Sequence, residues 1–366
     1  MKLKVNKYYL PDPSDGFVQA LKKRLTRRPV PAFPRTIQIQ TGTGCNADCI
    51  FCPYGETYDT QPKGQMEWGL FKKIVDESAR HHVRRISPYL MNEPFADRHL
   101  FEKIAYINEV NPRAKVVITS NGSLLTPPVV EKLLALGDGV HELYLSVQGI
   151  DKESYERTMR GGMDFERTLR NVDHLIQVMR ERRLKRPHLW ITMVDTDVID
   201  ARRAVAYWKG RGVSSKCTRL ENRGGNIADA DSFSRSHDMQ YFSTCTRLFK
   251  QMYIMFNGDV VLCCTDYSRK EVLGNVRERS LSDVWNGERA VDIRRKFLGD
   301  RIGELPLCGQ CKIDQEVEVE HRTQFDARFY TDDPTRPAPP PSSRLPVVAD
   351  KTPVRADAAQ GFCASP

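Results

Sequence analysis

Strand-like and helix-like segments alternate from about residue 36 to about residue 222, and this alternation constrains the fold more than any other feature. The helix-like stretches carry apolar residues on one face, as Val172, Ile176 and Met179 do. Six strands are predicted, over residues 36–41, 83–90, 114–120, 141–149, 188–195 and 215–222. Strands separated by helices of this length form right-handed βαβ units and a parallel sheet. We therefore expect an α/β fold with a partial (β/α)6 TIM-like barrel, whose chemistry lies in the loops after the strands.

Three cysteines lie in the loop after the first predicted strand, with the spacing C-x3-C-x2-C: Cys45, Cys49 and Cys52. Three thiolates on one short loop can bind three irons of a four-iron cluster, whereas a fully ligated cluster needs four cysteines. The fourth iron would then be open to substrate chemistry. A zinc knuckle is the alternative, but zinc prefers C-x2-C pairs and four ligands from one neighbourhood. The spacing therefore favours an iron–sulfur cluster with one open iron.

With Phe51 as the aromatic residue, the segment becomes C-x3-C-x-Φ-C and resembles the radical S-adenosylmethionine (SAM) superfamily. Other segments match that family in order. MNEPF at residues 91–95 is similar to its Gly-Gly-Glu-Pro motif, although Met91 and Asn92 replace the glycines. The resemblance implies that Glu93 accepts the methionyl ammonium of SAM. The full set of implied SAM contacts is Phe51, Asn92, Glu93, Pro94, Ser120, Asn121, Ser146 and Arg160.

The resemblance also implies a reaction. SAM would bind the open iron through its amino and carboxylate groups, and one electron from the reduced cluster would cleave SAM to a 5′-deoxyadenosyl radical. That radical would abstract a hydrogen atom from the substrate. The cofactors carry this chemistry, and the protein supplies orientation and excludes water.

A second group of cysteines follows the predicted barrel. Cys245, Gly258 and Cys263 have the spacing C-x12-G-x4-C, and Cys308 and Cys311 form a C-x2-C pair after a long gap. The pattern resembles the auxiliary-cluster domain called SPASM, or its shorter twitch relative. Four ligands suffice for one closed 4Fe–4S cluster, which favours electron transfer over substrate binding. Two alternatives stay open: a four-thiolate zinc site, and Cys264 in place of Cys263 as ligand.

Four regions are expected from these patterns. A basic arm covers residues 1–35, the radical SAM barrel 36–230, a small α+β auxiliary-cluster domain 231–320, and an extended or disordered Pro-rich tail 321–366. In the auxiliary domain, Asn257-Gly258 predicts a hairpin turn and Ser280 a helix start. The tenth cysteine, Cys363, falls in the tail.

The net charge of +9 is concentrated in the first 36 residues, which carry nine basic and two acidic residues. Such an arm can bind nucleic acid, a phosphorylated substrate or an acidic partner, or simply face solvent. The rest is nearly neutral, which argues against a nucleic-acid partner. No apolar stretch reaches the length of a membrane span, and the N-terminus has no signal-like apolar run. We therefore expect a cytoplasmic protein with no membrane contact and with a reducing partner such as flavodoxin or ferredoxin.

The expected function is oxidation of a small molecule, such as an aminocyclitol, sugar or nucleoside, with the auxiliary cluster as electron acceptor. About 36 residues precede the first strand, too few for the leader-binding domain that peptide-processing members often carry. A peptide or protein substrate and RNA modification remain alternatives. A redox-neutral epimerase is another, in which Cys217 or Cys264 donates a hydrogen atom to the substrate radical. Both thiols have an ordinary interpretation as small buried side chains.

Overall fold

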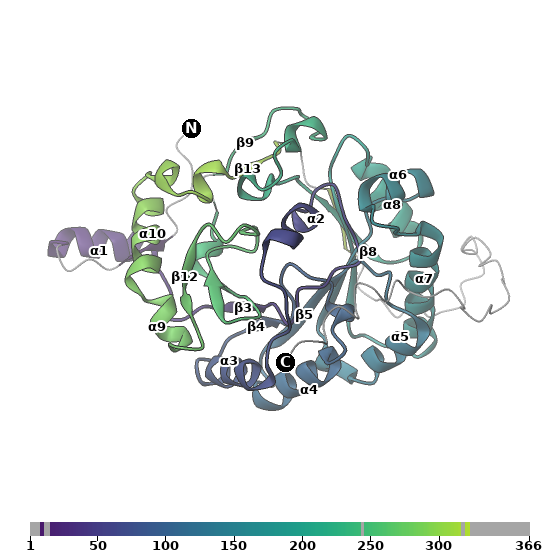
Figure 1. Ribbon diagram of the computed structural model, residues 1–366, viewed down its shortest axis with the longest axis horizontal. Helices are drawn as coiled ribbons and strands as arrows, with labels where there is room; N and C mark the ends of the chain where they lie inside the picture. The colour runs from purple at the N-terminus through teal and green to yellow at the C-terminus, as the bar shows by residue number, and fades with distance from the viewer. Residues whose placement is uncertain (1–7, 11–14, 243–244, 316–318, 323–366) are drawn as a thin grey trace.

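The computed structural model describes residues 8–10, 15–242, 245–315 and 319–322. Its main sheet has the strand order β12-β11-β10-β3-β4-β5-β6-β7-β8-β14 (Figure 1). The six central strands are mutually parallel. They are β3 (Thr36–Ile39), β4 (Arg85–Ser87), β5 (Lys115–Ser120), β6 (Glu142–Ser146), β7 (His188–Val194) and β8 (Ser214–Thr218). The predicted partial barrel of six βα units is thus confirmed.

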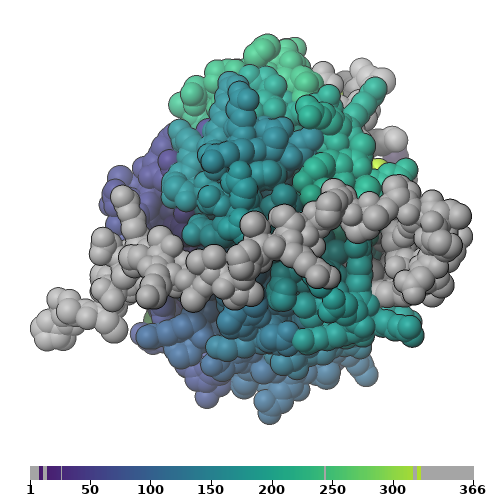
Figure 2. Space-filling model, turned by 90° about the vertical axis from the view of Figure 1, so that its right-hand side faces the viewer, coloured from purple at the N-terminus to yellow at the C-terminus, as the bar shows by residue number. Residues whose placement is uncertain are grey.

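Helices cover the outer face of these strands (Figure 1), and the blue-to-teal atoms of this region make up much of the face turned to the viewer in Figure 2. They are α3 (Trp68–Arg80), α4 (Leu100–Val110), α5 (Pro127–Leu134), α6 (Lys152–Met159), α7 (Phe165–Glu181) and α8 (Ala201–Gly210). On β6, Leu143 and Leu145 are fully buried in the main core, whereas Tyr144 and Ser146 are half-buried. Because side chains alternate along a strand, the inner face of the barrel is left with the more polar set.

The C-terminal part joins the barrel through backbone hydrogen bonds. Strand β10 (Gln251–Ile254) pairs in parallel with β3 and continues through a turn at Asn257-Gly258 into β11 (Asp259–Val261). Strand β12 (Val272–Asn275) then pairs with β11, and the helices α9 (Leu281–Trp285) and α10 (Glu288–Leu298) follow. Ser280 caps α9 in a reciprocal capping box. Local patterns predicted the turn and the cap, but not the pairing of β10 with β3.

Smaller elements complete the described chain. These are the helices α1 (Phe17–Thr26) and α2 (Tyr54–Thr57), and the strands β1 (Tyr8–Tyr9), β2 (Arg28–Pro29), β9 (Gln240–Tyr241), β13 (Lys312–Ile313) and β14 (Val319–His321). Short 3-10 turns span Tyr58–Thr60, Pro94–Ala96, Gly137–Gly139, Arg223–Gly225, Ala230–Ser232, Arg247–Phe249, Ile302–Glu304 and Cys308–Gln310. Strand β14 pairs antiparallel with β8 and contains His321, the first residue of the predicted tail. Most of that tail, including Cys363, lies outside the described residues. Among the described helices, none is long and apolar enough to span a membrane.

A buried ion pair fixes the segment between β4 and α4. The Lys103 ammonium lies 2.7 Å from an Asp97 carboxylate oxygen, and both side chains are 3% exposed. Asp97→Ala is expected to cost about 3–5 kcal/mol of unfolding free energy, because it leaves a buried ammonium without its partner. Urea denaturation measures this loss. The matched control, Glu131→Ala, breaks an exposed pair with Arg182 and should cost less than about 1 kcal/mol. Equal losses would contradict the assignment.

Candidate functional site

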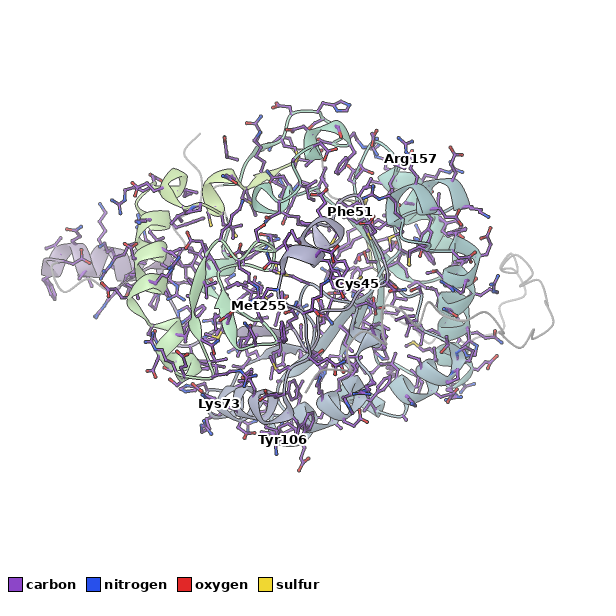
Figure 3. All side chains as sticks on the ribbon, in the orientation of Figure 1. Cys45, Phe51, Lys73, Tyr106, Arg157 and Met255 are labelled. Atoms are coloured by element: carbon purple, nitrogen blue, oxygen red, sulfur yellow. The ribbon has the colours of Figure 1, made fainter. Side chains whose placement is uncertain are left out.

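The first three cysteines lie in the loop between β3 and α2, at the carboxyl end of the barrel strands (Figure 3). The backbone N–H of Cys45 donates to the Tyr54 hydroxyl at 2.7 Å, and this hydroxyl donates to the Thr43 carbonyl at 3.0 Å. Farther along, the N–H groups of Asp48 and Ile50 donate to carbonyls at the end of α6. The loop is therefore held at both ends by the body of the barrel.

The three thiols are half-buried and free of disulfides. Burial raises the pKa of Cys45 and Cys49, and the neighbouring thiolate charges raise it further. Thiols placed together on one buried loop suit a cationic group that would bind them as thiolates. This donor set fits the iron–sulfur cluster expected from the sequence.

Glu93 lies beside the cysteine loop and begins the 3-10 turn Pro94–Ala96. Its backbone N–H donates to the Gly44 carbonyl at 2.9 Å, immediately before Cys45. The carboxylate accepts the Ser120 hydroxyl at 2.7 Å and the Asn121 backbone N–H at 2.8 Å. The side chain is 2% exposed, and burial raises its pKa to about 7. A buried carboxylate of this kind suits a cationic ligand group.

The raised pKa of Glu93 predicts a pH dependence for SAM binding. Glu93 is ionised above about pH 7 and neutral below it, so the hydrogen bond that the resemblance implies from the SAM amino group to this carboxylate would weaken as the pH falls. Affinity for SAM should decrease by up to about tenfold per pH unit below 7. Equilibrium dialysis of labelled SAM against the reconstituted, unreduced protein measures it. The isosteric control, Glu93→Gln, should bind weakly without this dependence; an unchanged pH profile in the control would contradict the role of Glu93.

The other residues predicted to contact SAM make their own hydrogen bonds or packing contacts and do not hydrogen-bond to Glu93. The Asn92 side chain accepts the Leu90 backbone N–H at 2.9 Å, and the Ser146 hydroxyl accepts the Gln148 amide at 2.6 Å. Arg160 donates to the Asp48 carbonyl at 2.9 Å, inside the cysteine loop. Pro94 is buried, and Phe51 packs into the main core at 5% exposure. The structure thus assembles Glu93, Ser120 and Asn121 as one group, while Arg160 and Phe51 support the loop.

The later cysteines form a second group. Burial raises the pKa of Cys245, Cys308 and Cys311, and each of these thiols lies close enough to Cys263 that its negative charge raises the pKa further. Cys245, Cys263 and Cys308 pack against one hydrophobic cluster, built around Phe249 and Phe297. Four converging thiols fit a closed four-iron cluster.

The two adjacent cysteines point to different surroundings. Cys263 packs with the other late cysteines, and its sulfur accepts the Thr265 hydroxyl at 3.3 Å. Cys264 packs against a different cluster, that of Leu90 and Tyr253, although its side chain is also a hydrogen-bond partner of Cys263. This arrangement favours Cys263 as the ligand, with the Cys264 thiol beside it.

Cys217 lies away from the inner face of the barrel. Its neighbour on β8, Lys216, places its ammonium over the Tyr144 ring at 4.9 Å, on the inner face. Because neighbouring side chains alternate on a strand, Cys217 faces the opposite side, where it is 1% exposed in the main core. This placement fits a structural role and does not favour hydrogen donation.

Several residues at the site were not predicted as ligands. The Tyr267 hydroxyl lies 3.3 Å from the Cys52 sulfur, and Tyr267 follows Cys263 by only four residues. One short segment therefore connects the two cysteine groups. Close by, Arg247 makes two contacts with the Glu221 carboxylate, at 2.9 and 2.5 Å. Asn46 joins the network by accepting the Asn121 amide at 2.9 Å. No local spacing indicates such contacts, since each joins segments distant in sequence.

Two family models match the chain: residues 39–203 match the radical SAM superfamily, and residues 245–312 match SPASM, an iron–sulfur cluster-binding domain. The S-adenosyl-L-methionine-dependent 2-deoxy-scyllo-inosamine dehydrogenase of Niallia circulans is 22% identical over 291 residues, covering 79% of this chain and 96% of that protein.

Solved structures share the fold. BtrN in complex with AdoMet and 2-DOIA aligns with a TM-score of 0.52 and 20% identity, covering 76% of this chain and 93% of that one. SuiB of Streptococcus suis bound to precursor peptide SuiA aligns with a TM-score of 0.57 and 18% identity, covering 75% of this chain and 69% of that one.

Proposed function

Because the chain belongs to the radical SAM superfamily and carries a C-terminal SPASM domain, we propose that it is a dehydrogenase of a small molecule. The substrate class is an aminocyclitol, sugar or nucleoside, and the reaction belongs to natural-product biosynthesis. The substrate loses one hydrogen atom to the radical derived from SAM and one electron to the auxiliary cluster, with release of a proton. The relationship to the 2-deoxy-scyllo-inosamine dehydrogenase supports this choice.

Two donor sets would hold the two clusters. Cys45, Cys49 and Cys52 bind the SAM cluster, and the second set is Cys245, Cys263, Cys308 and Cys311. When bound, the clusters and SAM supply one-electron chemistry and a radical that abstracts hydrogen.

The protein's own groups orient SAM and support the cluster loop. The Glu93 carboxylate accepts the ammonium, while Ser120 and Asn121 fix its rotamer through hydrogen bonds to its two oxygens. A ligating thiolate has no proton, so the Tyr267 hydroxyl would donate to the Cys52 sulfur. Burial of these groups excludes water, which protects a reactive radical from side reactions.

The observation that favours oxidation over a redox-neutral reaction is that the four late thiols lie close together. Four thiolates complete the coordination of a cluster, which leaves it suited to accept an electron and not to bind substrate. Redox-neutral epimerisation is the second candidate, because the charge of Cys264 acts on Tyr267, whose hydroxyl lies at the Cys52 sulfur.

Product mass separates these two reactions. The reconstituted protein is incubated anaerobically with SAM, a reductant and metabolite extracts from cells that lack the gene. A product lighter by two hydrogens supports oxidation. A product that gains one deuterium from heavy water, with otherwise unchanged mass, would replace oxidation by epimerisation. In that case Cys264→Ala should block the deuterium gain. A product on a peptide would refute the small-molecule assignment.

A further inference from the structure

Helix α1 presents an apolar row to solvent. Phe17, Val18, Leu21 and Leu25 are 83%, 77%, 44% and 78% exposed. Their spacing places them on one side of the helix. Figure 1 shows α1 extending from the body of the protein beside α10. Scattered exposed apolar residues are common, but four on one protruding helix form a patch of the kind found at interaction sites.

The same region is cationic. Helix α1 contains three basic residues and no acidic one. Beside it lies a cavity of about 190 Å³, lined by Tyr9, Leu10, Lys23, Arg27, Arg295, Leu298 and Gly299. Lys23 pairs with Asp15 at 2.7 Å. Arg27 and Arg295 have no acidic partner among the described residues, so the cavity can receive a carboxylate from another molecule.

The aromatic residues beneath this cavity connect it to the auxiliary cysteines. Tyr8, next to Tyr9 of the cavity, stacks on Phe249 with ring centroids 5.1 Å apart, and Phe249 contacts the Phe297 ring at 5.7 Å. These three rings belong to the hydrophobic cluster that packs against Cys245, Cys263 and Cys308. A protein docked over the cavity would therefore be separated from the auxiliary site by one layer of packed side chains.

We propose that the α1 row and the Arg27–Arg295 cavity form the docking surface for a small, acidic electron-carrier protein that exchanges one electron with the auxiliary cluster. The proposal rests on the proposed function, in which that cluster gains one electron per turnover and must pass it on. One electron leaves the cluster and enters the carrier, and no atoms are transferred. Charge complementarity selects an acidic partner, and the nearness of the auxiliary cysteines selects a redox protein. A membrane surface would contact the protruding helix α1 but would not reach Arg27 and Arg295, which line the cavity.

Binding is tested with purified oxidised flavodoxin and the full-length reconstituted protein, by thermophoresis at low and high salt. The double variant Arg27→Glu/Arg295→Glu should weaken binding at least about tenfold at low salt, and salt should weaken native binding. The control Arg157→Glu reverses an exposed charge on α6, on the opposite side of the molecule (Figure 3). Phe17→Ser/Leu25→Ser tests the apolar row and should also weaken binding. Equal binding by the double variant and the control would overturn the proposal.

Electron exchange is tested in a Cys49→Ala background, which should hold only the auxiliary cluster. Stopped-flow mixing with flavodoxin should show at least about tenfold slower transfer when Arg27 and Arg295 are reversed. Two results would overturn the proposal, each with flavodoxin binding unchanged in the same variants. Loss of binding to phosphatidylglycerol vesicles would assign the surface to a membrane. Loss of a dimer in sedimentation would assign it to a second copy of the chain. Absence of substrate oxidation would instead refute the proposed function, because the binding measurements need no turnover.

Discussion

Cys49→Ala is expected to abolish reductive cleavage of SAM and to remove about four of about eight irons per chain, because one 4Fe–4S cluster loses one of its three thiolate ligands. The loss of 5′-deoxyadenosine formation should exceed the roughly 10–100-fold that removal of an outer supporting contact costs. Iron analysis and chromatography of 5′-deoxyadenosine from dithionite-reduced protein measure both effects.

Cys217→Ala is the matched control for this substitution. It also removes a buried thiol, but from the core side of β8. Its iron content and SAM cleavage should stay near those of the native protein. If Cys49→Ala kept all its iron, or if Cys217→Ala lost as much, the first cluster would have been assigned to the wrong residues.

Cys263→Ala and Cys264→Ala should differ sharply, although the residues are neighbours. Cys263→Ala is expected to lose about four irons, while dithionite-driven SAM cleavage continues at the first cluster. Substrate oxidation should fall to background, since the substrate radical would have no electron acceptor. Cys264→Ala should keep all its iron, because Cys263 packs in the same cluster as Cys245 and Cys308, whereas Cys264 packs in another.

Iron content and the electron paramagnetic resonance spectrum of each reduced variant decide this assignment. If Cys264→Ala lost the signal of the second cluster and Cys263→Ala kept it, Cys264 would be the ligand in place of Cys263. Continued oxidation by iron-depleted Cys263→Ala would remove the auxiliary cluster from the reaction and would contradict the proposed electron route.

The barrel could be predicted because its signals are local. Apolar periodicity defined α7, Ser280 marked the start of α9, and the cysteine spacing indicated the first cluster loop. Each signal depends on residues within one or two turns of one another. The grouping of Cys245 and Cys263 with the distant pair Cys308 and Cys311 was inferred from resemblance to a family, not from local physics.

The contacts between distant segments could not be predicted. Nothing in the sequence near Tyr267 shows that its hydroxyl meets Cys52, since 215 positions separate the two. The same holds for the hydrogen bond from Ser120 to Glu93. It also holds for the two different clusters against which Cys263 and Cys264 pack. Such contacts depend on the register in which distant strands pair, and one residue of slip would turn every side chain to the other face.

The pairing of β10 with β3 gives the electron route a fixed length. The cysteine loop follows β3, and the strand that leads to Cys263 runs beside β3 in the same hydrogen-bonded ladder. A shift of one residue in that ladder would move one cysteine group by about 3.3 Å relative to the other. Electron tunnelling decays steeply with distance, so in the proposed reaction the rate from a substrate radical beside the first cysteine group to the auxiliary cysteines should be set once, when the sheet forms, and should not vary with domain motion during turnover.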